Sequence, residues 1–240
     1  MSDSTLKFAV AEILGVKATD PWKIEDQMDD LVLVHYTDTA DMNRFGWLRG
    51  VVVDVKAKTI VCRSFDYTPT VTADEISVAD DGLIHLIDER GLPLVLPESQ
   101  VSLRYSLEGT MIRVFYHNGK VIRATHRRLN IARSRWGNSK TFEQMYNELG
   151  GPRDEELFDL STKYSPYCYI FLLVHPDVLV ATKQYVGPGY IAYLGPRNMW
   201  PLEYDRCPYK QTGEAGELLV PETEFEADPR INAGYISDEF

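Results

Sequence analysis

The chain has 240 residues, of which 44% are hydrophobic and 25% are charged, a composition typical of a globular protein with one sizeable core. Its formal net charge of -11 argues against wholesale nucleic-acid binding, because attraction to phosphate requires a positive surface. No apolar run approaches the roughly 20 residues of a membrane helix, and the N-terminus lacks a secretory pattern. We therefore expect an intracellular protein, such as a cytoplasmic one, that is not secreted and has no membrane contact.

The cysteines say little about chemistry. Cys62, Cys168 and Cys207 lie far apart, each in or near apolar sequence, and are expected to be buried free thiols. No spacing of cysteine and histidine suggests zinc, so no metal site is expected.

The first third of the chain predicts a short helix followed by antiparallel strands. The helix runs over residues 5–14, with Ser4 or Thr5 as its cap and Gly15 at its end. We therefore take residues 1–30 as an N-terminal helical segment. The next elements are a buried strand and a hairpin around a polar turn, with strands at Leu31 to Tyr36, Val51 to Asp54 and Ile60 to Arg63.

The middle of the chain begins with a looser acidic region at residues 70–99, which contains short apolar pieces. A hairpin around Asn118 and Gly119 is the clearest element, because this dipeptide suits a two-residue turn. A helix follows, with Ser139 or Thr141 as its cap and Gly150 at its end.

The last third of the chain predicts further strands and then a tail. The strands cover residues 167–174, 178–184 and 190–195. Residues 31–200 are taken as the core, and residues 201–240 as an acidic, loosely structured tail rich in proline, glycine and glutamate. Hairpins with few helices indicate the α+β class.

Charge is distributed unevenly along the chain. The stretch from Arg113 to Lys140 contains no acidic residue, whereas residues 214–240 are strongly acidic. This basic stretch predicts a surface for polynucleotide phosphates, with six candidate residues: Lys120, Arg123, Arg127, Arg128, Arg133 and Arg135. Four rings could stack on bases, although we favour core packing for them: Phe115, Tyr116, His126 and Trp136.

Several short motifs occur in a specific order. They are R-G-V-V-V-D from Arg49, S-L-E-G-T-M-I-R-V from Ser106, T-H-R-R from Thr125, and a hydrophobic run after Phe171. In sequence and order they resemble the adenylyltransferase core of phage-type RNA ligases, within the covalent nucleotidyltransferase superfamily. The resemblance covers residues 32–198 and implies a nucleotidyltransferase (ATP-grasp-like ligase) core of two packed antiparallel sheets with flanking helices.

The resemblance also identifies matching and departing positions. Four residues match as remnants of a nucleotide pocket: Arg49, Glu108, Gly109 and Thr110. The nucleophilic lysine of the family is replaced by Ser106, which cannot form the phosphoramidate of the family reaction. The glutamate of a later motif is replaced by Leu172, which has neither charge nor acceptor, and the K-x-K motif is absent.

Three hypotheses follow from these residues. The first is a catalytically inactive RNA-ligase-like protein with a binding or structural role, needing no cofactor; its partner is RNA, another polynucleotide or a protein, and a viral or virion role is open. Under this hypothesis, charge reversal at Arg127 and Arg128 weakens polynucleotide binding. The second is an active ligase that uses ATP and Mg with Lys120 as the nucleophile and Lys183 as a phosphate contact. The third is an unrelated α+β domain whose glycines only form turns.

Overall fold

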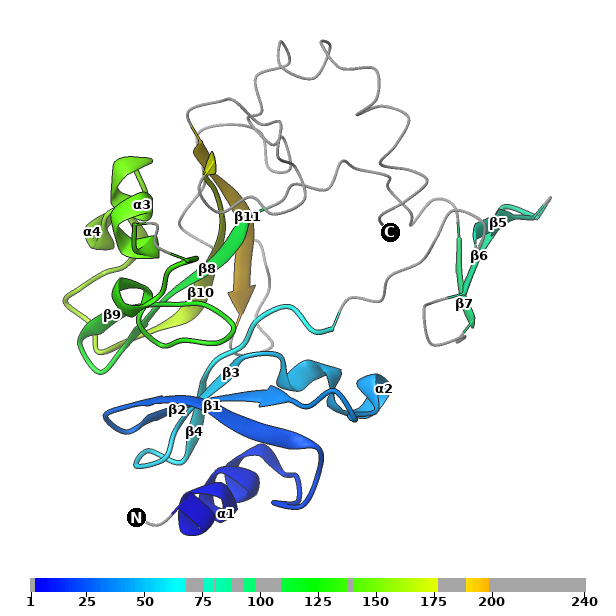
Figure 1. Cartoon of the computed structure of the whole chain (residues 1–240), viewed down its shortest axis with the longest axis horizontal. Helices are drawn as coiled ribbons and strands as arrows, with labels where there is room; N and C mark the ends of the chain where they lie inside the picture. The colour runs from blue at the N-terminus through cyan, green and yellow to red at the C-terminus, as the bar shows by residue number, and fades with distance from the viewer. Residues whose placement is uncertain are drawn as a thin grey trace. The chain divides into compact units, whose positions relative to one another are not determined.

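The computed structural model describes residues 3–67, 76–79, 81–87, 93–97, 109–137, 140–176 and 189–198. The chain divides into two compact units, one formed by Met1–Tyr67 with Glu108–Leu218 and the other by Thr68–Leu107 with Leu219–Phe240. Helices and antiparallel sheets occur together (Figure 1), which confirms the α+β class.

The first sheet has four antiparallel strands in the order β1-β2-β3-β4. Their bounds are Trp22–Met28, Leu31–Tyr36, Val51–Asp54 and Thr59–Cys62. Residues alternate between faces in strands, so Val32 and Val34 pack against helix α1 (Asp3–Leu14) while Leu31 and Leu33 pack on the opposite face. The predicted helix, the strand at Leu31 and the hairpin are thereby confirmed.

The first 30 residues are not wholly helical, which corrects the expected boundary of the helical segment. Trp22–Met28 is an edge strand that pairs antiparallel with β2. Its register shifts between Ile24 and Asp26. This irregularity breaks the period-2 alternation by which a strand is recognised from sequence.

The second sheet, in the same unit, has the order β11-β10-β8-β9. Its strands are β8 Thr110–His117, β9 Lys120–Ala124, β10 Tyr164–Val174 and β11 Tyr190–Asn198. The β8–β9 turn has φ of 51° at Asn118 and 75° at Gly119, the left-handed conformation that this dipeptide adopts readily. The predicted hairpin and the strands before and after residues 178–184 are confirmed.

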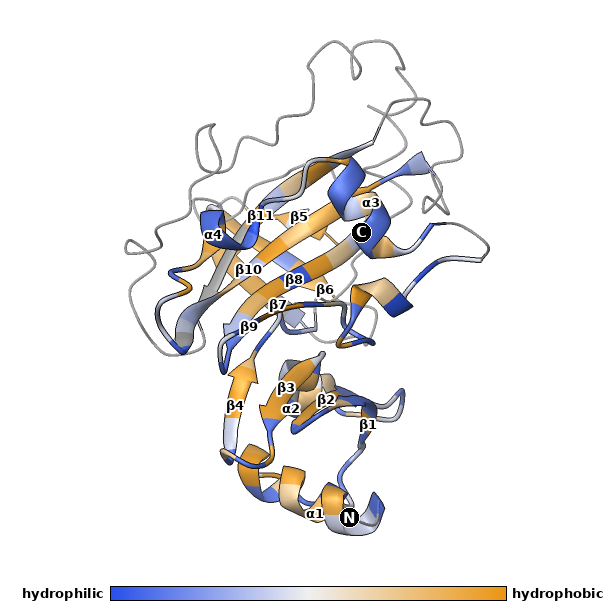
Figure 2. Cartoon of the chain, turned by 90° about the vertical axis from the view of Figure 1, so that its left-hand side faces the viewer, coloured by the Kyte–Doolittle hydropathy of each residue, from blue (hydrophilic) through white to orange (hydrophobic). Residues whose placement is uncertain are grey.

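Two short helices cover the outer face of the second sheet. Helix α3 (Phe142–Glu148) is capped by Thr141 and followed by Gly150, as predicted, and α4 is Asp154–Leu157. Phe142, Met145 and Tyr146 pack onto β8 and β10 in one buried cluster. Figure 2 shows the hydrophobic strands β8 and β10 behind more hydrophilic helices. The remaining short helices of the unit are α2 Met42–Phe45 and the 3-10 helices Gly46–Leu48 and Ile131–Arg133.

The two sheets face each other across a second buried layer. Leu33 and Val52 of the first sheet pack with Phe115 and Ile170 of the second. The order of layers in this unit is therefore α1, first sheet, second sheet, and α3 with α4. Two packed antiparallel sheets with flanking helices match the coarse architecture expected from the sequence.

The other unit contains a three-stranded antiparallel sheet of β5 (Ile76–Val78), β6 (Leu83–Ile87) and β7 (Pro93–Pro97). The sequence predicted a looser acidic region here and a continuous core over residues 31–200. The segment Thr68–Leu107 instead belongs to its own compact unit. Short strands with exposed Val78 and Val95 lack the hydrophobic alternation that marks a half-buried sheet.

Some expectations lie outside the described residues, namely the strand at residues 178–184 and the tail at residues 201–240. Among the helices that the structure describes, none has the length and apolar character needed to cross a membrane.

Candidate nucleotide pocket and polynucleotide surface

The described part of the S-L-E-G-T motif begins at Gly109, because Ser106 and Glu108 lie outside the described residues. Gly109 precedes β8 and lies close to β10. A Cβ atom at this position would be 2.7 Å from the Leu173 carbonyl oxygen and 2.9 Å from the Leu172 Cγ. Neither contact is compatible with a side chain, so glycine is required here for close packing of the strands and not only for a turn.

Leu172 occupies the space in front of Gly109. It lies on β10 between Met111 of β8 and Ala192 of β11, and it is 9% exposed. The resemblance implies a glutamate here, which would offer oxygen atoms to a metal or a ribose. An isobutyl group offers no acceptor. The space in front of Gly109 is therefore occupied by an apolar side chain.

The structure brings Arg49-Gly50 and the Thr125–Arg128 turn together, although 75 or more positions separate them in the sequence. Gly50 has φ of 69°, and a Cβ atom there would be 3.1 Å from the Cα of His126. Arg49 is half-buried and donates to the Asp66 carbonyl oxygen at 3.4 Å. Two of the motifs that suggested the resemblance thus meet at one place between the sheets.

Arg113 links these two motifs from within the core, which corrects its assignment to the basic surface. It is 0% exposed. One terminal nitrogen donates to the Gly50 carbonyl oxygen, and Nη2 donates to the Thr125 carbonyl oxygen at 2.6 Å. On β8 it shares a face with Phe115, which packs between the sheets, so alternation directs it inward.

A serine and a histidine form a close pair nearby. Ser64 Oγ lies 2.6 Å from His126 Nε2, a separation that would suit a nucleophile and its base. However, burial and the positive charges of Arg113 and Arg49 lower the pKa of His126 to about 2. An imidazole with so low a pKa is a weak base toward the Ser64 hydroxyl.

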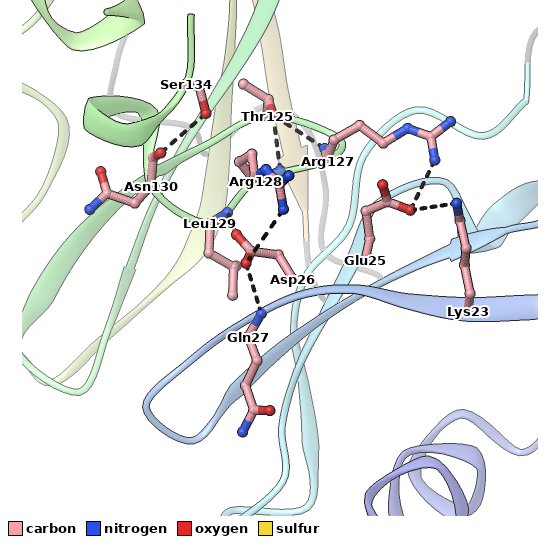
Figure 3. Close-up of polar contacts among 10 residues, drawn as sticks. All are labelled: Lys23, Glu25, Asp26, Gln27, Thr125, Arg127, Arg128, Leu129, Asn130 and Ser134. Carbon is pink, nitrogen blue, oxygen red and sulfur yellow. Dashed lines mark hydrogen bonds and ion pairs between the residues drawn. The ribbon is translucent and has the colours of Figure 1, made fainter. Parts of the chain in front are cut away.

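Acidic residues of the β1–β2 hairpin neutralise much of the basic stretch. Figure 3 shows Glu25 between Lys23 and Arg127, each 3.0 Å from the carboxylate. Asp26 accepts from the Leu129 N–H at 2.8 Å and lies 3.9 Å from Arg128. Arg127 and Arg128 are therefore held against β1.

Two more of the six candidate cations are also paired. Lys120 Nζ lies 3.4 Å from Asp29. Arg123 pairs with Asp154, and its guanidinium lies 5.3 Å from the centre of the Tyr146 ring, so it fixes β9 to α3 and α4. This placement corrects the prediction that the basic residues form one continuous surface.

Arg133 and Arg135 differ from these four. Both side chains are exposed, and neither has an ion pair within the described part of the chain. Trp136 follows them, is 54% exposed and donates from Nε1 to Thr110 Oγ1 at 3.3 Å. We call Arg133, Arg135 and Trp136 the Trp136 surface. Phe115 and Tyr116 are buried, which confirms core packing for these two rings.

Two buried polar pairs between the sheets were not predicted. His117 Nε2 lies 2.7 Å from Asp54 Oδ2, and both side chains are almost fully buried. Burial alone would raise the pKa of Asp54, but hydrogen bonds from the Ala57 N–H and from His117 outweigh it and lower the pKa. The only sequence signal was an aspartate at the end of an apolar strand.

The second pair consists of Cys62 and Cys168, whose sulfur atoms lie 3.3 Å apart and share a hydrogen bond. Burial would raise the pKa of the Cys62 thiol, but the hydrogen bond with Cys168 and the Arg113 charge lower it. Burial and the neighbouring sulfur raise the pKa of Cys168. The expectation of buried free thiols is confirmed for both, but their proximity could not be inferred from positions 106 residues apart.

Comparison with known proteins gives one partial similarity. A 46-residue stretch is 48% identical to the immediate-early protein ICP-46 homolog of Invertebrate iridescent virus 3. The match covers 19% of this chain and 10% of that protein. No family model matches the chain, and no solved structure matches it.

Within the described residues, no group of three or more histidine, cysteine, aspartate or glutamate side chains is arranged to hold a metal ion. Lys183, the second hypothesis's phosphate contact, lies outside these residues. Lys120, its candidate nucleophile, is at the far end of the β8–β9 hairpin from Gly109.

Proposed function

We propose that this chain has an RNA-ligase-like nucleotidyltransferase fold that has lost nucleotidyl transfer and binds single-stranded RNA. The observation that carries the loss of activity is the packing of Leu172 against Gly109, 2.9 Å from the Cβ that any other residue would have. This contact puts apolar atoms where the family would place an acidic side chain. The serine at position 106 removes the amine nucleophile as well.

Nucleotidyl transfer is tested by incubating the chain with α-labelled ATP and Mg²⁺, followed by denaturing electrophoresis. We expect no label on the chain, and none on a Ser106→Lys variant, because Leu172 still fills the space in front of Gly109. A phage-type RNA ligase serves as the positive control. Labelling of the unchanged chain would overturn the proposed loss of activity, and loss of that label in Lys120→Ala would favour the active alternative. Labelling of Ser106→Lys alone would show that the pocket remains open.

The Trp136 surface supports the binding half of the proposal. An exposed indole offers a face on which any base can stack. The two guanidinium groups beside it have no ion pair among the described residues and attract the phosphates of the strand. A single strand presents its bases for stacking, whereas a duplex does not. The net charge of -11 restricts attraction to this local patch.

Binding is tested by fluorescence anisotropy with a labelled single-stranded RNA of about 15 nucleotides, a length that exceeds one typical binding site. We expect Arg133→Gln with Arg135→Gln to weaken binding by about tenfold or more and to reduce its salt dependence. Trp136→Ala should weaken binding by a similar factor, whereas Trp136→Phe should retain most of it.

The matched control removes the same number of charges from the paired part of the stretch. Arg127→Gln with Arg128→Gln should change affinity by less than about threefold, because Glu25 and Asp26 already neutralise these residues. Equal losses in both double variants would contradict a local site. No binding of RNA by the unchanged chain would refute this half of the proposal and leave a protein partner as the alternative.

The viral setting of the proposal rests on the partial similarity found among known proteins. The partial similarity is to a protein of an invertebrate iridescent virus. We therefore propose a viral origin for the chain and an intracellular or virion-associated role.

A further inference from the structure

The contact between Cys62 and Cys168 joins two different sheets. Cys62 ends β4 in the first sheet, and Cys168 lies within β10 in the second. Both side chains are fully buried in the layer between the sheets, with sulfur atoms 3.3 Å apart. A disulfide bond has an S–S distance of about 2.05 Å, so bond formation requires the sulfurs to approach by a little over 1 Å.

The surroundings of the two sulfurs are not equivalent. A terminal nitrogen of Arg113 lies 3.7 Å from the Cys62 sulfur and places a positive charge beside it. Arg113 has no contact with a carboxylate among the described residues; its other acceptors are the carbonyl oxygens of Gly50 and Thr125. A thiolate at Cys62 would place a negative charge 3.7 Å from this guanidinium. Thiolates, not thiols, react with peroxides and disulfides.

We propose that Cys62 and Cys168 are a redox modification site at which a hydroperoxide forms a reversible disulfide between the two sheets. The inference is independent of RNA binding.

The reaction has two steps. In the first, the Cys62 thiolate attacks an oxygen of the hydroperoxide, the O–O bond breaks, and the departing alkoxide or hydroxide takes up a proton. Cys62 is thereby oxidised by two electrons to a sulfenic acid. In the second, the Cys168 sulfur attacks the Cys62 sulfur, the S–S bond forms, and the S–O bond breaks. The departing hydroxide takes the Cys168 proton and leaves as water, so two thiols and one hydroperoxide yield a disulfide, an alcohol or water, and one further water.

Burial determines which oxidants react. Neither sulfur is accessible to solvent in the closed structure, so local separation of the sheets has to admit the oxidant. Hydrogen peroxide is small enough to enter through a brief opening, whereas bulky thiol reagents are excluded. The second step then competes well with further oxidation, because the resolving sulfur is already in contact.

The test treats the full folded chain with stoichiometric hydrogen peroxide, blocks remaining thiols under denaturing conditions, and analyses tryptic peptides without reduction. The sequence places each cysteine in a different peptide, at residues 59–63, 164–183 and 207–210. We expect a mass loss of about 2 Da, a cross-link between peptides 59–63 and 164–183, and reversal by a dithiol.

Two cysteine variants test whether the cross-link is specific to Cys62 and Cys168. In Cys168→Ser, peroxide should leave a sulfenic acid at Cys62 that a dimedone probe traps when it is added with denaturant, because the resolving sulfur is gone. Cys207→Ser should form the same cross-link as the unchanged chain. The proposal is overturned by a cross-link that involves residues 207–210 in place of either partner, by irreversible sulfinic acid at Cys62 without a cross-link, or by unmodified Cys62 in all samples.

Discussion

Replacement of Arg113 by alanine is expected to lower the free energy of unfolding by about 3–5 kcal/mol. Its side chain is fully buried and satisfies the carbonyl oxygens of Gly50 and Thr125. Alanine would leave both acceptors buried without a donor, at about 1–3 kcal/mol each, and would add a cavity. Because the two carbonyl groups belong to different segments, the loss of their hydrogen bonds to Arg113 would loosen the layer between the sheets.

Two other substitutions separate the causes of this loss. Arg113→Met fills most of the volume but donates no hydrogen bond, so its cost should lie below that of alanine while remaining above about 1 kcal/mol. Arg135→Ala removes an exposed arginine and should change stability by less than about 0.5 kcal/mol. Guanidinium unfolding monitored by circular dichroism measures all three. A loss below 1 kcal/mol for Arg113→Ala would show that the guanidinium does not support the inter-sheet layer.

Replacement of Asp54 by alanine should also cost about 3–5 kcal/mol, because it removes one partner of a buried pair. Its carboxylate accepts from His117 Nε2 at 2.7 Å and from the N–H groups of Lys56 and Ala57 at 2.9 and 2.8 Å. Alanine would leave these donors without their acceptor. Asp29→Asn, which alters an exposed pair with Lys120, is the matched control and should cost less than about 1 kcal/mol.

The Asp54 pair also predicts how stability depends on pH. The folded pKa of Asp54 is lowered below its ordinary value of 3.8. Its contribution is therefore fully present above pH 3.8 and is lost as pH falls through the lower, folded pKa. Unfolding free energies measured between about pH 2 and pH 6 should fall more steeply in the unchanged chain than in Asp54→Asn. Parallel profiles for the two proteins would mean that Asp54 is not stabilised by its partners.

Under the proposed RNA-ligase-like fold, Arg49-Gly50, Gly109 and Thr125–Arg128 are expected in this order, and the structure brings the first and last of these together. The departures at Ser106 and Leu172 were readable from sequence. Only the structure indicates what Leu172 does, since its contact with Gly109 depends on the register of β10 against β8.

Local features of the chain were determined by the sequence alone. Asn118-Gly119 favours a tight hairpin turn, Thr141 caps the helix that follows it, and runs of valine and leucine favour the strands β2 and β3. These signals act over a few residues, because turn conformation, capping and side-chain alternation depend on near neighbours.

Only the tertiary structure determines which basic side chains are exposed and able to contact a phosphate. Asp29, Asp26 and Glu25 reach cations 91 to 102 positions later in the sequence and neutralise them. In the same basic stretch Arg113 is buried, whereas Arg133 and Arg135 remain exposed. Pairing and burial of this kind depend on how sheets pack, and no local pattern encodes that packing. The sequence therefore predicted a basic stretch, and the fold reduced it to the Trp136 surface.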